Sequence, residues 1–146
     1  MISTILAPLT IPPGRPLDVI VADDESADNF LMALAALDAK ADMNLTFVED
    51  GEELLQILAE RVGAGSIPDV VVLDIRMPRC TGLEAMEIIS ESEVLRQIPV
   101  VLFTTSRRAA DLERGLSLGV TRFEIKPSSF AGLVDFVSEL AGLVRG

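Results

Sequence analysis

Apolar and polar residues follow two different periods along most of this chain. Apolar and β-branched residues are concentrated in five short runs, some interrupted by polar residues, at positions 17–21, 44–48, 70–73, 100–103 and 122–125. After each run, apolar residues recur every three or four positions, which is the spacing of one face of a helix. These helical segments include residues 30–37, 54–58, 83–89, 112–116 and 130–144. The pattern therefore predicts five strands, each followed by a helix.

Strands that alternate with helices form a parallel sheet with helices on both faces. The runs 70–73 and 100–103 are apolar at every position, as expected of strands buried on both faces. The run 44–48 is half polar, which is typical of a strand at the edge of a sheet. Connections that cross over between parallel strands are almost always right-handed, which leaves few possible arrangements of the five strands. We expect a doubly wound, flavodoxin-like α/β fold with strand order 2-1-3-4-5 and five helices.

The first sixteen residues do not follow this pattern. They contain four prolines and no basic residue before Arg15. A signal peptide needs a basic start and an unbroken apolar segment, and both are missing here. We expect an N-terminal extension over residues 1–16, a single domain over residues 17–146 with no output domain after it, and a cytoplasmic location.

Composition narrows the possible chemistry. The chain has 12 Lys and Arg against 23 Asp and Glu, a net charge of −11, which argues against binding nucleic acid. No apolar run approaches the roughly 18 residues of a membrane-spanning helix. The absence of His and the single cysteine, Cys80, exclude the usual zinc ligands and the Ser-His and Cys-His catalytic pairs. The remaining polar groups favour a hard cation that binds oxygen.

Acids and other polar residues follow four of the predicted strands. Asp23 and Asp24 end the first strand, Asp74 the third, Thr104 the fourth and Lys126 the fifth. In open α/β sheets, ligands bind beyond the carboxyl ends of the strands. Three crowded carboxylates repel one another, and Mg²⁺ relieves this repulsion and also binds phosphate oxygens. A carboxylate in this position, such as Asp74, can attack a phosphoryl group, while Lys126 and the Thr104 hydroxyl neutralise its charge.

Four motifs together resemble the receiver domains of two-component response regulators. They are the pair Asp23-Asp24 and the segments DIRMPRCTG (74–82), IPVVLFT (98–104) and FEIKP (123–127). Each motif lies at the end of a predicted strand, in the order that this family shows. The resemblance covers roughly residues 17–144 of the chain.

The resemblance implies a metal and phosphate site. Asp74 would be the phosphoacceptor, and Asp23 and Asp24 the acidic pair that binds Mg²⁺ together with Asp74. The backbone carbonyl of Arg76 would complete the metal shell, although this position is often Asn or another small polar residue. Lys126 would bind the phosphoryl oxygens.

The resemblance also implies a switch. Thr104 would be the switch hydroxyl, and Phe123 stands where the family has a switch aromatic, often Tyr. Because Phe123 has no hydroxyl, it would have to act through packing alone. The bond between Lys126 and Pro127 is similar to one that is commonly cis in this family.

A protein of this type accepts a phosphoryl group from a sensor histidine kinase or a phosphotransfer protein. It catalyses only its own phosphorylation and dephosphorylation, and it signals through contacts with a downstream protein that the sequence does not identify. Homodimers through the last helix and the neighbouring strand are consistent with the resemblance. The run Thr104-Thr105-Ser106 and the long stretch after Glu60 resemble stand-alone regulators, some of which pair with bacteriophytochrome kinases.

Other interpretations remain open from the sequence. Asp23 and Asp24 alone could be helix caps. The chain could be an interaction module that keeps the fold and works without phosphorylation. It could also be a phosphohydrolase with an aspartyl nucleophile, although the haloacid-dehalogenase type has a second acid where this chain has Arg76. On the last helix, Phe136 and Leu143 lie off the main apolar stripe, which predicts surface or partner-facing positions.

Overall fold

The computed structural model describes residues 15–145, so most of the expected N-terminal extension lies outside the described residues. The strands are β1 (Leu17–Ala22), β2 (Met43–Val48), β3 (Val70–Leu73), β4 (Val100–Thr104) and β5 (Arg122–Ile125). The helices are α1 (Ser26–Asp38), α2 (Gly51–Gly63), α3 (Gly82–Glu91), α4 (Ala109–Ser117) and α5 (Phe130–Arg145), with a 3₁₀ turn η1 (Leu95–Gln97) before β4. The predicted alternation of strands and helices is confirmed.

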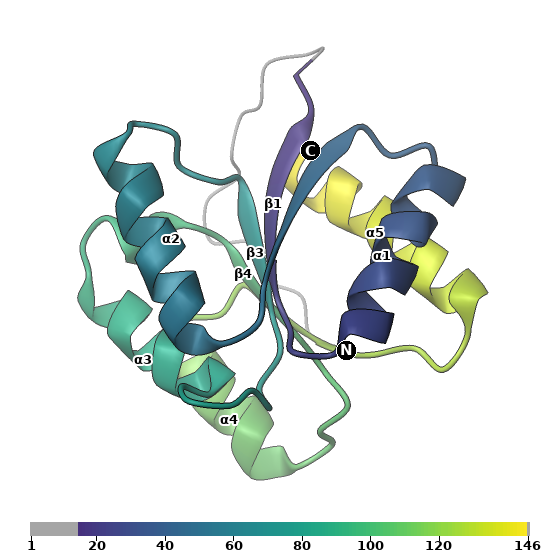
Figure 1. The fold of residues 1–146 in the computed structure, drawn as a ribbon. Helices are drawn as coiled ribbons and strands as arrows, with labels where there is room; N and C mark the ends of the chain where they lie inside the picture. The colour runs from purple at the N-terminus through teal and green to yellow at the C-terminus, as the bar shows by residue number, and fades with distance from the viewer. Residues whose placement is uncertain (1–14, 146) are drawn as a thin grey trace.

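The five strands form one parallel sheet in the order β2-β1-β3-β4-β5, which confirms the predicted topology. β1 lies inside the sheet, where Val19 pairs with Leu45 on one side and with Val70 on the other. Helices α1 and α5 cover one face of the sheet, and α2, α3 and α4 cover the other (Figure 1). All five strands therefore end at the same edge, where the chain turns back into a helix.

An apolar layer fills each side of the sheet. Under α2 and α3, the layer includes Ile20, Leu54 and Leu58, all at most 1% exposed. Under α1 and α5, it includes Val19 and Val137, which are equally buried. Alternate residues of β1 thus serve opposite layers, and each fully buried side chain of this size contributes about 1.5–3 kcal/mol.

The apolar stripe that predicts α1 does not face the core. Phe30, Leu34 and Leu37 are 64%, 38% and 76% exposed. The buried residues of α1 are Met32, Ala35 and Ala36, and the two small alanines allow the helix to pack closely beside α5. The helix was predicted correctly, but its larger apolar residues lie on the solvent side.

Two residues of α5 are more buried than their positions predicted. Phe136 is 7% exposed and stacks on Phe103, with ring centroids 4.1 Å apart and an angle of 15° between the rings. Leu143 is half-buried and packs against the same apolar layer. The expected surface position of Phe136 is wrong because Phe103 of β4 widens the apolar strip that α5 covers.

Helix α4 is anchored differently from the others. It is nine residues long, and its one buried residue is Gly115. A Cβ atom at Gly115 would lie 2.5 Å from Leu102 Cδ1, so this glycine lets the helix backbone approach β4. The residue before the helix, Arg108, makes no capping hydrogen bond with its side chain. Within residues 15–145, no helix is long and apolar enough to span a membrane.

Candidate functional site

Backbone hydrogen bonds beyond the strands fix the positions of the candidate residues. The Asp23 amide donates to the Val48 carbonyl at 3.0 Å, and the Asp74 amide donates to the Ala22 carbonyl at 2.9 Å. At the far side, the Lys126 amide donates to the Thr104 carbonyl at 2.8 Å. These bonds continue the sheet ladder by one residue, so the side chains that follow three strands project from one edge.

Three of the predicted metal ligands lie together. Asp23, Asp24 and Asp74 each present a carboxylate oxygen, and these three oxygens lie within 4.8 Å of one another. Asp23 and Asp74 are 4% and 7% exposed, whereas Asp24 is open to solvent. The set contains only carboxylate oxygens and is open on one side. It therefore fits Mg²⁺, which binds one or two carboxylates and keeps other positions for water or phosphate.

Lys126 is the cation of the site. Its Nζ donates to Asp23 Oδ2 at 2.6 Å and to Asp74 Oδ2 at 3.2 Å. A third bond, at 3.0 Å, goes to Asp28 Oδ2, a residue that the sequence analysis missed. The available signal was the position of Asp28 in the first turn of the helix that follows the acid pair. An ammonium group has three donors, so these three bonds use all of them.

Two groups of the site have raised pKa values, for different reasons. Burial raises the pKa of Asp23 above its ordinary value, and the hydrogen bonds from Lys126 and from the Glu25 amide offset this only in part. Burial alone would lower the pKa of Lys126, but the hydrogen bond that Lys126 donates to Asp23 and the charge of Asp74 outweigh it and raise this pKa. Lys126 therefore stays charged at neutral pH. One ammonium faces three carboxylates, which leaves a local excess of negative charge that a divalent cation would balance.

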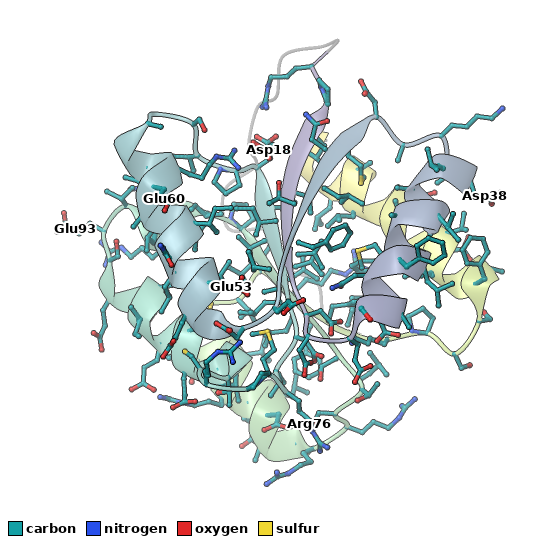
Figure 2. All side chains as sticks on the ribbon, in the orientation of Figure 1. Asp18, Asp38, Glu53, Glu60, Arg76 and Glu93 are labelled. Carbon is teal, nitrogen blue, oxygen red and sulfur yellow. The ribbon has the colours of Figure 1, made fainter. Side chains whose placement is uncertain are left out.

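The loop after Asp74 is held tightly against the backbone of Asp74. The Gly82 amide donates to the Ile75 carbonyl at 2.9 Å, and a Cβ on Gly82 would lie 2.0 Å from the Asp74 carbonyl oxygen. Only glycine allows α3 to begin so close to Asp74. Arg76 lies in this loop with an exposed side chain, at the same end of the sheet (Figure 2). The backbone carbonyl of Arg76 therefore lies in a loop that is held in place at both ends, by Asp74 and by Gly82.

A second tie connects this loop to α2. Asp50, which is 1% exposed, caps α2 by accepting from the Glu53 amide at 2.8 Å. The same carboxylate accepts from Nε of Arg79 at 2.7 Å, and a second guanidinium nitrogen also contacts it. The Gly51 amide donates to the Cys80 carbonyl at 2.9 Å. The start of α2 and the loop after Asp74 thus form one connected unit.

The predicted switch hydroxyl, Thr104, is fully buried at the end of β4. Its Oγ1 accepts from the Ser106 amide at 3.2 Å, and the Ser106 hydroxyl donates to Asp111 in the first turn of α4. Phe123 is 9% exposed and lies on β5 beside Leu102. It lines a groove of about 530 Å³ between α4 and β5. Thr104, at the end of β4, and Phe123, on β5, therefore both lie near the start of α4, on different sides of it.

One expectation about the backbone is wrong. Residues 15–145 contain no cis peptide bond, so the bond between Lys126 and Pro127 is trans. The trans isomer of a bond before proline is favoured by about 0.5–1 kcal/mol. Lys126 reaches Asp23 and Asp74 from this isomer.

The model of the response regulator receiver domain matches residues 19–138. The chain belongs to the response regulator receiver family. It is 36% identical to a probable methanogenesis regulatory protein, FilR2, of Methanothrix harundinacea, over 86% of this chain and 81% of that protein. It is 29% identical to the two-component response regulator ORR11 of Oryza sativa, over 87% and 82% of the two chains.

Solved structures of receivers have the same fold. A response regulator in red light signalling of R. palustris, RPA3017, is 29% identical, with a TM-score of 0.76 and coverage of 86% of this chain and 90% of that one. The bacteriophytochrome response regulator AtBRR is 30% identical, with a TM-score of 0.70 and coverage of 88% and 94%. Receiver domains take up phosphoryl groups in two-component systems, typically with Mg²⁺ held by acidic residues, and they are generally not catalytic enzymes. The chain is a receiver domain of this type.

Proposed function

We propose that this receiver accepts a phosphoryl group on Asp74, with Mg²⁺ bound by Asp23, Asp24, Asp74 and the Arg76 carbonyl. The observation that carries the proposal is the group of three carboxylates within 4.8 Å, with Lys126 bonded to two of them. Acids without a matching number of cations at the end of a parallel sheet are suited to a divalent cation and a phosphoryl group. The donor would be a phosphohistidine on a sensor histidine kinase or a phosphotransfer protein.

The transfer is a substitution at phosphorus. A carboxylate oxygen of Asp74 forms the new P–O bond as the P–N bond to the donor histidine breaks, and the imidazole keeps the electron pair and takes up a proton. Mg²⁺, when bound, neutralises charge on the phosphoryl oxygens. Lys126 donates a hydrogen bond to one of these oxygens, and the Thr104 hydroxyl turns to donate to another. The product is an acyl phosphate on Asp74.

The new charge would change the α4–β5 face. When the Thr104 hydroxyl turns toward the phosphoryl group, its bond from the Ser106 amide is lost, and Ser106 is the residue that holds Asp111 of α4. Phe123 then repacks in the groove between α4 and β5, through shape alone because it carries no hydroxyl. We propose that this face contacts the downstream protein.

We also propose that a second copy of the chain can pair through α5 and the neighbouring strand β5. The net charge of −11 favours protein partners over nucleic acid.

The cytoplasm is the compartment in which we expect this signalling. Residues 1–16 form an extension to the domain in this proposal.

Two alternatives are not favoured. A module that works without phosphorylation has no need for three carboxylates within 4.8 Å of one another, with one lysine bonded to two of them, because this arrangement costs repulsion. A phosphohydrolase of the haloacid-dehalogenase type needs a second acid at the position of Arg76, and this side chain is exposed.

The test is intact-protein mass spectrometry after incubation with acetyl phosphate, with Mg²⁺ or with EDTA. The wild type should gain one phosphoryl group with Mg²⁺ and none with EDTA. Asp74→Asn should gain none, while Asp38→Asn, which removes the same charge from an exposed site on α1, should match the wild type. Stable uptake by Asp74→Asn would show that the acceptor is a different residue.

A wild type that gains nothing needs a second measurement. Beryllofluoride with Mg²⁺ mimics a phosphoryl group on a carboxylate, and its binding can be followed by ¹⁹F NMR. Binding that disappears in Asp74→Asn supports a site with a short-lived phosphoryl group. No binding would favour the interaction module that works without phosphorylation.

A further inference from the structure

The three hydrogen bonds of Lys126 do not go to equivalent acids. Asp23 and Asp74 belong to the group of oxygens that fits a metal ion, and their side chains are 6% and 8% exposed. Asp28 lies outside that group, on the first turn of α1, and its side chain is 46% exposed. The receiver site as described above needs Asp23, Asp74 and Lys126, but it does not use Asp28.

Asp28 gives the Lys126 ammonium a hydrogen-bond partner outside the group of acids that fits a metal ion, at the border of a pocket. A pocket of about 250 Å³ lies beside the lysine, and both Asp28 and Lys126 line it, together with Met32 of α1 and Leu133 of α5. The bond from Nζ to Asp28 is 3.0 Å long, shorter than the 3.2 Å bond to Asp74. The ammonium is thus shared between the phosphoacceptor and an acid at the border of this pocket.

We infer that Asp28 is a positioning residue that holds the Lys126 ammonium partly away from Asp74 and thereby slows phosphoryl uptake. A phosphoryl oxygen on Asp74 needs one N–H of Lys126, and all three are already used by carboxylates. The charge of Asp28 also partly cancels the positive potential of the lysine, which would attract an anionic phosphoryl donor. The effect on uptake rests on the proposed function, whereas the contact itself does not.

The kinetic test compares uptake rates from limiting acetyl phosphate with Mg²⁺. We expect Asp28→Asn to take up phosphate about fivefold faster than the wild type, because one negative charge beside Lys126 is lost. Asp28→Glu restores the charge within reach of the lysine, so its rate should return to within about twofold of the wild type. A residue that only supported the fold would give slower uptake in all variants.

The matched control is Glu25→Gln. It removes the same charge from an exposed residue of the same helix start, three positions away, without touching Lys126. At 0.5 M salt, where the screening length falls to about 4 Å, its rate should equal that of the wild type, while Asp28→Asn should stay faster. Equal acceleration by both variants would mean a general charge effect and would overturn the inference.

The contact is tested without phosphorylation. The chain has two lysines, Lys40 and Lys126, so selective ¹⁵N-lysine labelling gives two Nζ signals. The Lys126 signal should shift in Asp28→Asn and stay in place in Glu25→Gln, and the exposed Lys40 should not change in either. Circular dichroism of each variant shows whether it is folded.

The two proposals fail in different ways. If the wild type takes up no phosphoryl group and binds no beryllofluoride, the proposed function is overturned, and the Lys126 signal alone decides the contact. An unshifted Lys126 signal in folded Asp28→Asn overturns the inference, whatever the uptake. A shifted signal with uptake that is unchanged or slower overturns its kinetic part.

Discussion

The two ends of the sheet use acidic residues in opposite ways. At the amino end, Asp69 accepts two hydrogen bonds from Arg15, at 3.1 and 2.9 Å, and one from the Asp18 amide at 2.8 Å. Asp18 in turn pairs with Arg61 of α2. Asp69 and Asp18 thus each have their own guanidinium partner. Figure 2 labels Asp18 at this end and Arg76 at the other.

At the carboxyl end, one ammonium serves three acids, because Asp23, Asp28 and Asp74 all accept from Lys126. Asp24 adds a further carboxylate close to Asp23 and Asp74. Balanced pairs stabilise the fold and leave no charge for a ligand. An excess of acids over cations costs stability, and in the proposed function it binds Mg²⁺ and a phosphoryl group. The balance of charge therefore distinguishes the amino end of the sheet, where acids stabilise the fold, from the carboxyl end, where we propose the site.

The largest effect should come from Lys126→Ala, which removes the ammonium that is bonded to Asp23, Asp28 and Asp74. Two buried carboxylates would lose their partner, so we expect the free energy of unfolding to fall by about 3 kcal/mol in EDTA. Mg²⁺ should restore more stability to the variant than it adds to the wild type. Urea denaturation with and without Mg²⁺ measures both effects, and equal gains from Mg²⁺ would contradict the idea of a charge excess.

Asp69→Ala tests the amino end. It leaves the Asp18 amide without its partner, and we expect a loss of about 2 kcal/mol in the free energy of unfolding. Phosphoryl uptake from acetyl phosphate should be unchanged at a temperature where the variant is folded. Arg15→Ala is the control, because solvent screens this partly exposed arginine, so its removal should cost much less stability than Asp69→Ala.

Asp74→Asn should have the opposite sign to Asp69→Ala. Removing one of the crowded carboxylates relieves repulsion, and we expect about 1 kcal/mol of added stability in metal-free buffer. The same change should weaken Mg²⁺ binding, so the stabilising effect of Mg²⁺ becomes smaller. Thermal unfolding with a Mg²⁺ titration checks both results, and a destabilised variant would argue against excess charge at this end.

The smallest expected effect concerns Asp50, which allows two kinds of acid to be compared within the carboxyl end of the sheet. Asp50 follows β2 at this end but is paired one-to-one with Arg79, so we expect it to behave like the acids at the amino end. The hydrogen bond from the Glu53 amide, followed by the Arg79 guanidinium, lowers the pKa of Asp50. Its stabilising effect is therefore full above the pKa of the unfolded chain and is lost as pH falls through the folded pKa.

We expect Asp50→Asn to reduce the loss of Tm that occurs as the pH falls below the ordinary pKa of an aspartate. At neutral pH, the cost should be about 0.5–1 kcal/mol, because Asn also caps helices but does not pair with Arg79. Thermal unfolding from pH 7 to pH 2 measures both. An acid transition identical to that of the wild type would mean that Asp50 does not contribute through its charge.

The sequence predicted the topology, and it predicted which acids and which lysine meet at the carboxyl edge of the sheet, because both depend on local patterns. Apolar runs mark buried strands, and Asp23, Asp74 and Lys126 directly follow them. The errors arose where the answer depends on tertiary packing. Helical periodicity identifies an apolar stripe but does not show which stripe faces the sheet, so the exposure of Phe30 and the burial of Phe136 were not predicted.

Asp28 was missed for a related reason. Its contact with Lys126 joins residues 98 positions apart, and it depends on the distance of α1 from the end of β5. No spacing within one element contains that information. The trans bond before Pro127 also depends on the local fit of the chain, which the resemblance to a family did not determine.

Helix α4, which buries only a glycine and has no side-chain cap, has a consequence for hydrogen exchange. A helix with so little buried apolar surface opens at a free energy well below that of global unfolding. Its amide protons should therefore exchange with deuterium long before those of β1 and β3. Protection of the amide protons from exchange thus falls from the centre of the sheet toward α4. The helix α4 forms a local unfolding unit directly beside Thr104. A small change in charge at Thr104 can therefore alter how often this helix opens.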